Sequence, residues 1–179
     1  MKRELISPPV VGPVSITDVK QWSVIEGSDD DNLIAMLIVR ATNYAEDYMR
    51  RQIMPQTWTY YFDSFDPIIC INASPVVSVS IKYDDADDAE QTLDSAEYYA
   101  DTKAYPVAIT AVSSWPTTKA KPNAVRVSLV CGYADANSVP ESIKAGVLLL
   151  IGHFYEDREG AAEIPGSAHM MLDKYRIAF

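Results

Sequence analysis

The sequence predicts an α+β protein in which a helical core, with two long helices and several short ones, is interrupted by a β-rich antiparallel insertion. Helix-forming patterns occupy residues 15–54 and 139–176, and β-branched and aromatic residues separated by turn residues fill the stretch between them. The apolar period changes from 3.6 to 2 residues at Pro55. We therefore expect residues 1–56 and 134–179 to form the helical core, and residues 57–133 to form the insertion subdomain.

The first fourteen residues predict an extended arm, because three prolines and a glycine interrupt any helical pattern there. Such an arm has little secondary structure in which to bury its own apolar side chains. It packs either on its own domain or on a neighbouring subunit. The apolar side chains concerned are Leu5, Ile6, Val10 and Val11.

A short helix and a long helix are predicted next. Ser15 suits the N-cap of a helix that ends near Trp22. Ser28 suits the N-cap of the following helix, whose first turn is rich in aspartate, and Pro55 stops that helix. An apolar stripe at helical spacing supports it: Leu33, Leu37, Ala41, Tyr44 and Tyr48.

The middle of the chain predicts a small antiparallel sheet or barrel with its own core. It holds 11 of the 18 aromatic residues. The acidic run at 84–90 lacks the glycine and the distal glutamate of a calcium-binding loop, so it is interpreted as a solvated hairpin turn. The strands are expected at 57–62, 68–71, 76–83, 92–93, 98–100, 108–112 and 124–131.

The second long helix begins with a capping-box pattern, in which Ser138 precedes Glu141 by three residues and Pro140 lies in the first turn. It is expected to run to about Glu159, with Gly160 after its end and a last short helix at 168–176. The helix is apolar nearly all round. It is either the central helix of its own core, or it packs one side on another subunit. The residues that extend the apolar surface are Leu148, Leu149 and Ile151.

The composition excludes several classes of function. The net charge is −10, and residues 57–138 contribute most of it with 5 basic and 11 acidic side chains. Because binding to a nucleic-acid backbone requires Lys and Arg to displace counterions, this chain is a poor candidate for it. Cys70 and Cys131 lie in apolar runs and predict buried, reduced thiols in an intracellular protein, with a disulfide between them as the alternative. The absence of a signal-peptide pattern and of a long apolar run predicts a soluble protein without a membrane segment.

No residues with site chemistry are identified, so we expect no catalytic residue, no cofactor, no metal ligand and no enzymatic activity. His153 and Asp157 are four residues apart on one helix, but a zinc site needs further histidine or cysteine ligands nearby. No phosphate-binding loop or nucleophile elbow is present. The charged residues at 156–159 can form ion pairs within the helix or across an interface.

Several short motifs follow one another along nearly the whole chain. They are Pro8-Pro9, Thr17-Asp18-Val19-Lys20, Tyr44-Ala45-Glu46, Thr57-Trp58, Ser74-Pro75-Val76, Trp115-Pro116, Gly132-Tyr133, Val139-Pro140, Tyr155-Glu156-Asp157-Arg158-Glu159 and Tyr175-Arg176. In order and spacing they resemble the head–tail connector proteins of bacteriophages and prophages. These are also called adaptor or head-completion proteins and are often labelled as DNA-packaging proteins.

The resemblance implies a structural virion protein that forms a homo-oligomeric ring, commonly of about twelve subunits, at the head–tail junction. Its implied partners are the portal protein and tail-completion proteins, and it is assembled in the host bacterial cytoplasm. DNA passes through the lumen without sequence-specific binding, because an acidic lumen repels phosphate. The residues expected at subunit contacts are Leu5, Ile6, Val10, Val11, Leu148, Tyr155, Arg158 and Glu159.

Two other functions remain open from the sequence. One is a monomeric module that binds another protein through exposed aromatic residues of the β insertion. The other is an uncharacterised metal-dependent enzyme that uses the acidic loop.

Overall fold

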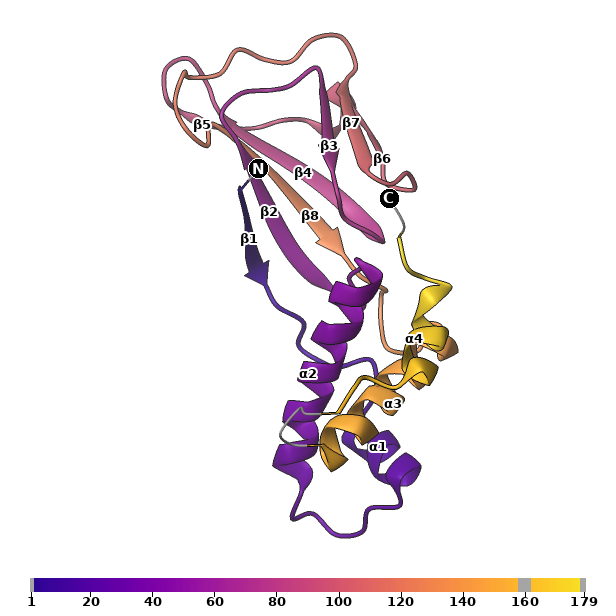
Figure 1. Ribbon diagram of the computed structural model, residues 1–179. Coiled ribbons are helices and arrows are strands. Elements are labelled where there is room, and N and C mark those ends of the chain that lie inside the picture. Colours follow the sequence, from indigo (N-terminus) through magenta and orange to yellow (C-terminus); the bar gives the residue numbers. More distant parts are fainter. Residues whose placement is uncertain (1, 158–161, 178–179) are drawn as a thin grey trace. The chain divides into compact units, whose positions relative to one another are not determined.

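The computed structural model describes residues 2–157 and 162–177 and confirms the predicted α+β class (Figure 1). The chain divides into two compact units, each built from two separate pieces of sequence. A β unit consists of Met1–Pro9 and Pro55–Gly132, and a helical unit consists of Val10–Met54 and Tyr133–Phe179.

The helical unit contains α1 (Ile16–Ser23), α2 (Asp31–Met49), α3 (Glu141–Glu156) and α4 (Gly166–Asp173). Helix α2 packs on α3, and α3 packs on α4. Burial of one face of each helix supplies the hydrophobic stabilisation of this unit. Its fully buried side chains include Ile34, Ala41, Met49, Ile143, Leu150 and Leu172.

The helix ends follow the sequence in part. Ser15 caps α1 in a capping box with Asp18, as predicted. The N-cap of α2 is Asp30, not the predicted Ser28, and the helix ends at Arg50 in a left-handed conformation, before Pro55 is reached. The predicted capping box at the start of α3 does not form, because the Ser138 side chain donates to Asp135 instead. The predicted helix end at Glu159 and Gly160 lies outside the described residues.

The β unit contains two antiparallel sheets. The larger has the strand order β1-β2-β8-β4-β5 and the smaller has the order β3-β7-β6. A 3-10 helix, η1 (Ser95–Glu97), precedes β6. The strands are β1 (Lys2–Ser7), β2 (Gln56–Phe62), β3 (Ile68–Ile71), β4 (Val76–Asp84), β5 (Glu90–Thr92), β6 (Tyr98–Asp101), β7 (Val107–Ala111) and β8 (Val125–Cys131).

Strand β8 forms the centre of the larger sheet, since it pairs with both β2 and β4. Its side chains alternate between buried and half-buried, as expected for a strand with one face on a core. The core of the β unit gathers large apolar side chains from both sheets. They include Tyr60, Ile69, Ile81, Ile109, Val127 and Leu129.

Strand β1 departs from the sequence prediction, which placed residues 1–56 in the helical core. Lys2–Ser7 pairs antiparallel with β2 and is an edge strand with every side chain exposed. Its charged residues contact the aromatic side chains of β2: Arg3 lies 4.8 Å from the Trp58 ring centroid, and Glu4 accepts a hydrogen bond from the Tyr61 hydroxyl at 2.7 Å. These contacts hold Lys2–Ser7 against β2, although its sequence has no strong strand pattern.

The two cysteines differ in environment. Cys131 is buried in the core of the β unit, as predicted. Cys70 is exposed, because β3 alternates exposed and buried side chains and Cys70 lies on its outer face. The prediction of two buried thiols is therefore wrong for Cys70.

Candidate subunit interface

An open, mostly apolar groove of about 960 Å³ lies on the helical unit. Its walls come from the segment that precedes α1, from α1 itself, from α2, and from the first half of α3. Its apolar lining includes Val10, Val11, Trp22, Val39 and Leu148, and its polar lining includes Asp18, Glu141 and Lys144. Apolar clefts of this kind are candidate binding surfaces.

The segment before α1 forms one wall because Gly12 lets it approach α2 closely. A Cβ atom at Gly12 would lie 2.5 Å from Cγ2 of Ile38, which is closer than two carbon atoms can approach. The segment next to the glycine therefore lies against the helix. Val10 and Val11 remain exposed at the groove, with Val10 96% accessible.

Helix α2 contributes a second apolar surface besides its core stripe. Leu37 and Ala41 of the predicted stripe are buried in the core, and Ile34 is buried there in place of Leu33, which is half-buried. Met36 and Val39 are apolar but lie on the outer side, where they are 64% and 60% exposed. A helix in a single core usually carries polar residues at these positions. This outer surface of α2 is therefore a candidate for contact with another protein.

Helix α3 has one side buried in the core and another that lines the groove. Ile143, Val147 and Leu150 are buried in the core, whereas Lys144 and Leu148 line the groove. This arrangement agrees with the sequence observation that α3 is apolar on more sides than one small core covers. The part of Leu148 that the core leaves uncovered faces the groove.

The polar residues at the groove are ordered by local hydrogen bonds. Asp18 accepts hydrogen bonds from the side chain and the backbone N–H of Ser15, and these bonds hold the pKa of Asp18 below its ordinary value. Glu141 and Lys144 form an ion pair of 2.9 Å one helical turn apart. The groove thus combines an apolar lining with two exposed carboxylates, those of Asp18 and Glu141.

The predicted contact residues fall in different places. Val10, Val11 and Leu148 come together at the groove. Leu5 and Ile6 lie on β1 of the other unit and are exposed there. The Tyr155 hydroxyl donates to Asp30 at 2.6 Å, so this tyrosine joins α3 to the start of α2 within the helical unit. Arg158 and Glu159 lie outside the described residues. The assignment of these residues to subunit contacts stays a prediction.

Sequence reasoning missed the groove residues Trp22 and Val39, and the exposed Met36 of α2, as contact candidates. A signal for two of them was present, because Met36 and Val39 are apolar residues outside the core stripe of α2. Trp22 carried no such signal, since a tryptophan at the end of a short helix is equally consistent with burial.

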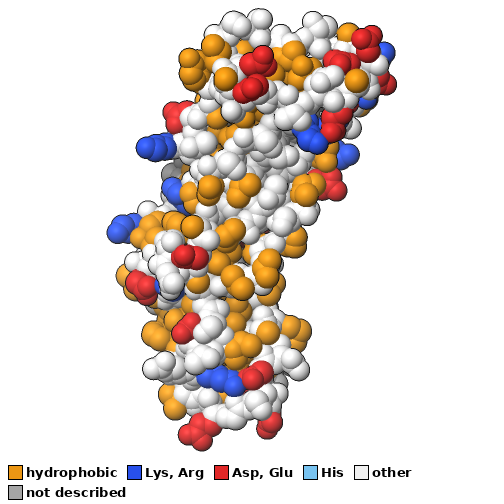
Figure 2. All heavy atoms as spheres, turned by 180° about the vertical axis from the view of Figure 1, so that it is seen from behind, with side chains coloured by type: hydrophobic (Ala, Val, Ile, Leu, Met, Phe, Trp, Pro, Cys, Tyr) orange, Lys and Arg blue, Asp and Glu red, His pale blue; other side chains and the backbone are white. Residues whose placement is uncertain are grey.

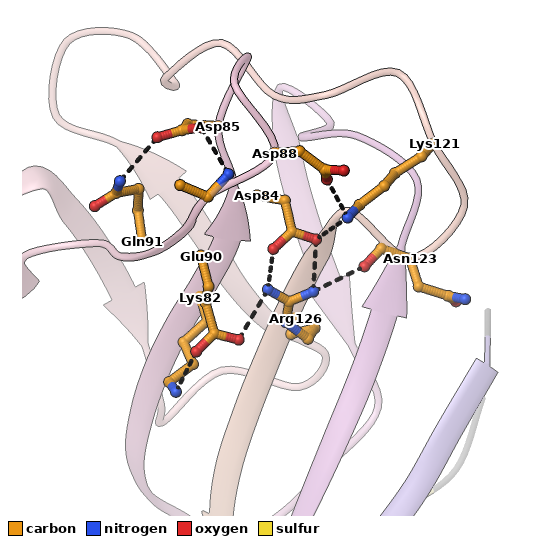
Figure 3. A network of polar contacts seen from close by, with 10 residues as sticks. Lys82, Asp84, Asp85, Asp88, Glu90, Gln91, Lys121, Asn123 and Arg126 are labelled. Atoms are coloured by element: carbon orange, nitrogen blue, oxygen red, sulfur yellow. Dashed lines mark hydrogen bonds and ion pairs between the residues drawn. The ribbon is translucent and has the colours of Figure 1, made fainter.

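The acidic run of the β unit forms the hairpin that joins β4 to β5, as predicted, but its first residue, Asp84, is buried and not solvated. Asp84 forms hydrogen bonds and ion pairs with Arg126 and Lys121, and these bonds hold its pKa far below the ordinary value of 3.8 (Figure 3). Asp85 accepts hydrogen bonds from backbone N–H groups within the turn. Within residues 2–157 and 162–177, no three His, Cys, Asp or Glu side chains lie close enough to hold a metal ion.

A second apolar surface lies on the outer face of the sheet β3-β7-β6. Ile68 and Tyr99 are in register with Thr110 between them, and Tyr99 is 66% exposed. Hydrophobic side chains also reach the surface at several places on the face drawn in Figure 2, where Lys and Arg appear as isolated groups with no continuous basic patch. No helix among the described residues is both long and apolar enough to cross a membrane.

The fold has close counterparts among solved structures of gene transfer agent (GTA) particles. A chain from the neck of an empty GTA particle, computed with C6 symmetry, matches with a TM-score of 0.86 at 14% identity, covering 100% of this chain and 97% of that one. A chain from the virion of a native GTA particle matches with a TM-score of 0.83 at 14% identity and the same coverage. A chain from the neck of a native GTA particle, computed with C12 symmetry, gives 0.74 at 15% identity, covering 98% and 96%.

No family model and no curated protein sequence matches the chain. At these identities, the structural likeness shows that the whole chain shares the fold of the GTA chains, including both units.

Proposed function

We propose that the chain is a structural virion protein of the neck, which forms a ring between the portal and the tail and completes the DNA-filled head. The observation that carries this proposal is the end-to-end likeness to a GTA neck chain, with a TM-score of 0.86 over 100% of this chain. A match over the full length of both chains covers every element that could form the subunit contacts. The sequence motifs point independently to head–tail connector proteins.

The surface chemistry supports a ring subunit. A ring subunit needs apolar surfaces that remain after its own core is complete, since each subunit must bury contacts with two neighbours. The groove of the helical unit is such a surface. The counterparts come from neck structures computed with C6 and C12 symmetry, which fits a cyclic arrangement of about twelve copies of this chain.

The charge supports passage of DNA without capture. The net charge of −10 gives a chain of this size a field that repels phosphate. A DNA duplex in the lumen of such a ring can move, because few Lys or Arg side chains hold its backbone. Sequence-specific binding is not part of the proposed function.

The test locates the protein in particles made from the genome that encodes it. An epitope is inserted after Lys103, which is exposed between β6 and β7. Gold-labelled antibody is expected at the head–tail junction of purified particles. Label on the capsid or along the tail, or no label on intact particles that carry an accessible epitope elsewhere, contradicts the proposal.

A deletion provides the functional arm of the test. Loss of the gene is expected to leave DNA-filled heads without tails, and expression of the intact chain in trans is expected to restore tailed particles. Normal yields of infectious, tailed particles without the gene would refute a head-completion role.

The second candidate is a monomeric protein-binding module of the β unit, favoured by the exposed pair Ile68 and Tyr99. It predicts that Tyr99→Ser abolishes binding to a virion partner while the groove variant Val39→Glu does not. The ring proposal predicts that Val39→Glu is the more damaging change.

A further inference from the structure

The helical unit presents apolar surfaces on opposite sides of α3. On one side, Lys144 and Leu148 line the groove. On the other, Gly146 lies against α4, and a Cβ atom there would be 2.8 Å from the Leu172 side chain. Two residues correspond to a rotation of about 200° around an α-helix, so Gly146 points away from both groove residues. Helix α4 and the groove therefore lie on opposite sides of α3.

The outer face of α4 carries exposed methionines. Ala168 and Leu172 are buried against the rest of the helical unit. Met170 is two residues from each of them, so it points outward, and it is 70% exposed. Met171 is 36% exposed beside it. Methionine is flexible and polarisable and adapts well to irregular apolar grooves.

The charges next to these two surfaces are complementary. Asp18 and Glu141 are exposed carboxylates at the groove, and Glu141 has only the neighbouring Lys144 as its partner among the described ion pairs. Lys174 and Arg176, directly after α4, are exposed cations. Opposite charges at the edges of two apolar surfaces favour one orientation of docking.

A closed ring requires this kind of arrangement. In a cyclic oligomer each subunit uses two different surfaces, one for each neighbour. In a ring of about twelve subunits, each subunit is rotated by about 30° relative to the next, so its two contact surfaces face nearly opposite directions. A groove and a projecting apolar helix on opposite sides of one rigid helix satisfy that condition.

We infer that the outer face of α4, with Met170 and Met171, docks in the groove of the next subunit, with Lys174 near Asp18 and Glu141. The occupant of the groove is thus a second copy of this chain. This inference rests on the proposed ring and specifies which surfaces form it.

The test is cross-linking of the full-length protein within assembled particles. A Cys70→Ser background removes the exposed thiol of β3. Cysteine replaces Val39 in the groove and Met170 on α4, separately and together, and a short bis-maleimide joins thiols that lie close. The doubly substituted protein is expected to give a ladder beyond the dimer, because each subunit is joined to two neighbours.

The single variants are informative because the proposed contact is head-to-tail. Particles assembled from a mixture of the two single variants are expected to give dimers and nothing larger. Either single variant alone is expected to give monomers. A matched control replaces Val39→Cys by Asp47→Cys, on the exposed face of α2 about 12 Å further along the helix, and is expected to give no ladder.

Three results would overturn the inference: monomers only from particles that contain the double variant, the same ladder with Asp47→Cys, or cross-links from Val39→Cys to a different virion protein. Failure of the proposed function can be told apart from failure of this inference, because the epitope label would then be missing from the neck. If the label is at the neck and the ladder is absent, the ring remains and only these contact surfaces are wrong.

Charge reversal gives a second readout that does not depend on the cysteine variants. Glu141→Lys and Lys174→Glu are each expected to reduce the yield of tailed particles at least tenfold, and the double reversal is expected to recover most of it. If the double reversal gives no more tailed particles than either single variant, the inference is contradicted.

Discussion

The two leucines Leu148 and Leu150 allow a sharp test of the roles assigned to the sides of α3. Both are replaced by alanine, so the chemical change is the same. Leu150 is fully buried in the helical core, whereas Leu148 is partly buried and lines the groove. The substitution at Leu150 removes buried methylene groups and leaves a cavity, which costs roughly 3–5 kcal/mol of folding free energy. At Leu148 less buried surface is lost and the site is open, so the cost is about 1 kcal/mol.

Leu148→Ala is expected to affect assembly more than folding, whereas Leu150→Ala acts mainly on folding. Leu148→Ala weakens each subunit contact by about 1 kcal/mol if the groove is covered by a neighbour, which is about a fivefold change per contact. Because each subunit of a ring has two such contacts, the variant is expected to fold normally and to assemble poorly.

The assay separates the two effects. Denaturant unfolding followed by the helical circular dichroism signal reports on the helical unit, since all α-helices of the described residues lie there. Sedimentation of the concentrated protein and counts of tailed particles report on assembly. The reasoning is refuted if Leu148→Ala destabilises folding as much as Leu150→Ala does, or if it leaves assembly unchanged.

Three further predictions follow from the packing. Asp84→Asn is expected to lower the denaturant midpoint at neutral pH and to flatten the pH dependence of that midpoint. The pKa of Asp84 is depressed in the folded protein, so the stabilisation from its carboxylate is present above pH 3.8 and is lost as the pH falls below that value. Denaturant unfolding at several acidic pH values measures this loss. Gly146→Val is expected to cost about 1–3 kcal/mol and to release α4, because the new side chain overlaps Leu172, and limited proteolysis of the C-terminal segment detects that release. Deletion of residues 2–7 is expected to expose the edge of β2 and to promote aggregation, seen by light scattering, and an unchanged monomer would contradict it.

Much of the secondary structure could be predicted because it depends on local patterns. The stripe on α2 and the capping box of Ser15 require only neighbours in sequence. The start of α2 was placed two residues early, since Ser28 and Asp30 are both good N-cap residues and their order does not decide between them. The strands of the β unit other than β1 were located from alternation and turn residues alone.

The pairing of the strands could not be predicted in the same way. Strand β8 lies between β2 and β4, and the residues of β8 alone do not indicate that it pairs with these two strands. Strand β1 was missed because its six residues are mostly charged or exposed and become a strand only against the aromatic side chains of β2. The groove depends on the approach of Gly12 to Ile38, which is a tertiary contact with no local signal.

Each unit is built from two separate pieces of sequence, and this arrangement determines when each unit can finish folding during synthesis. Gln56 of β2 is paired with Cys131 of β8, so the larger sheet lacks its central strand until most of the chain has been translated. The groove likewise needs the first half of α3, and the opposing helix α4 comes later still. A ribosome-bound fragment therefore carries neither a complete sheet nor both of the proposed contact surfaces. For the proposed ring, we therefore expect only finished, released subunits to assemble, and nascent chains on the same messenger to remain unassembled.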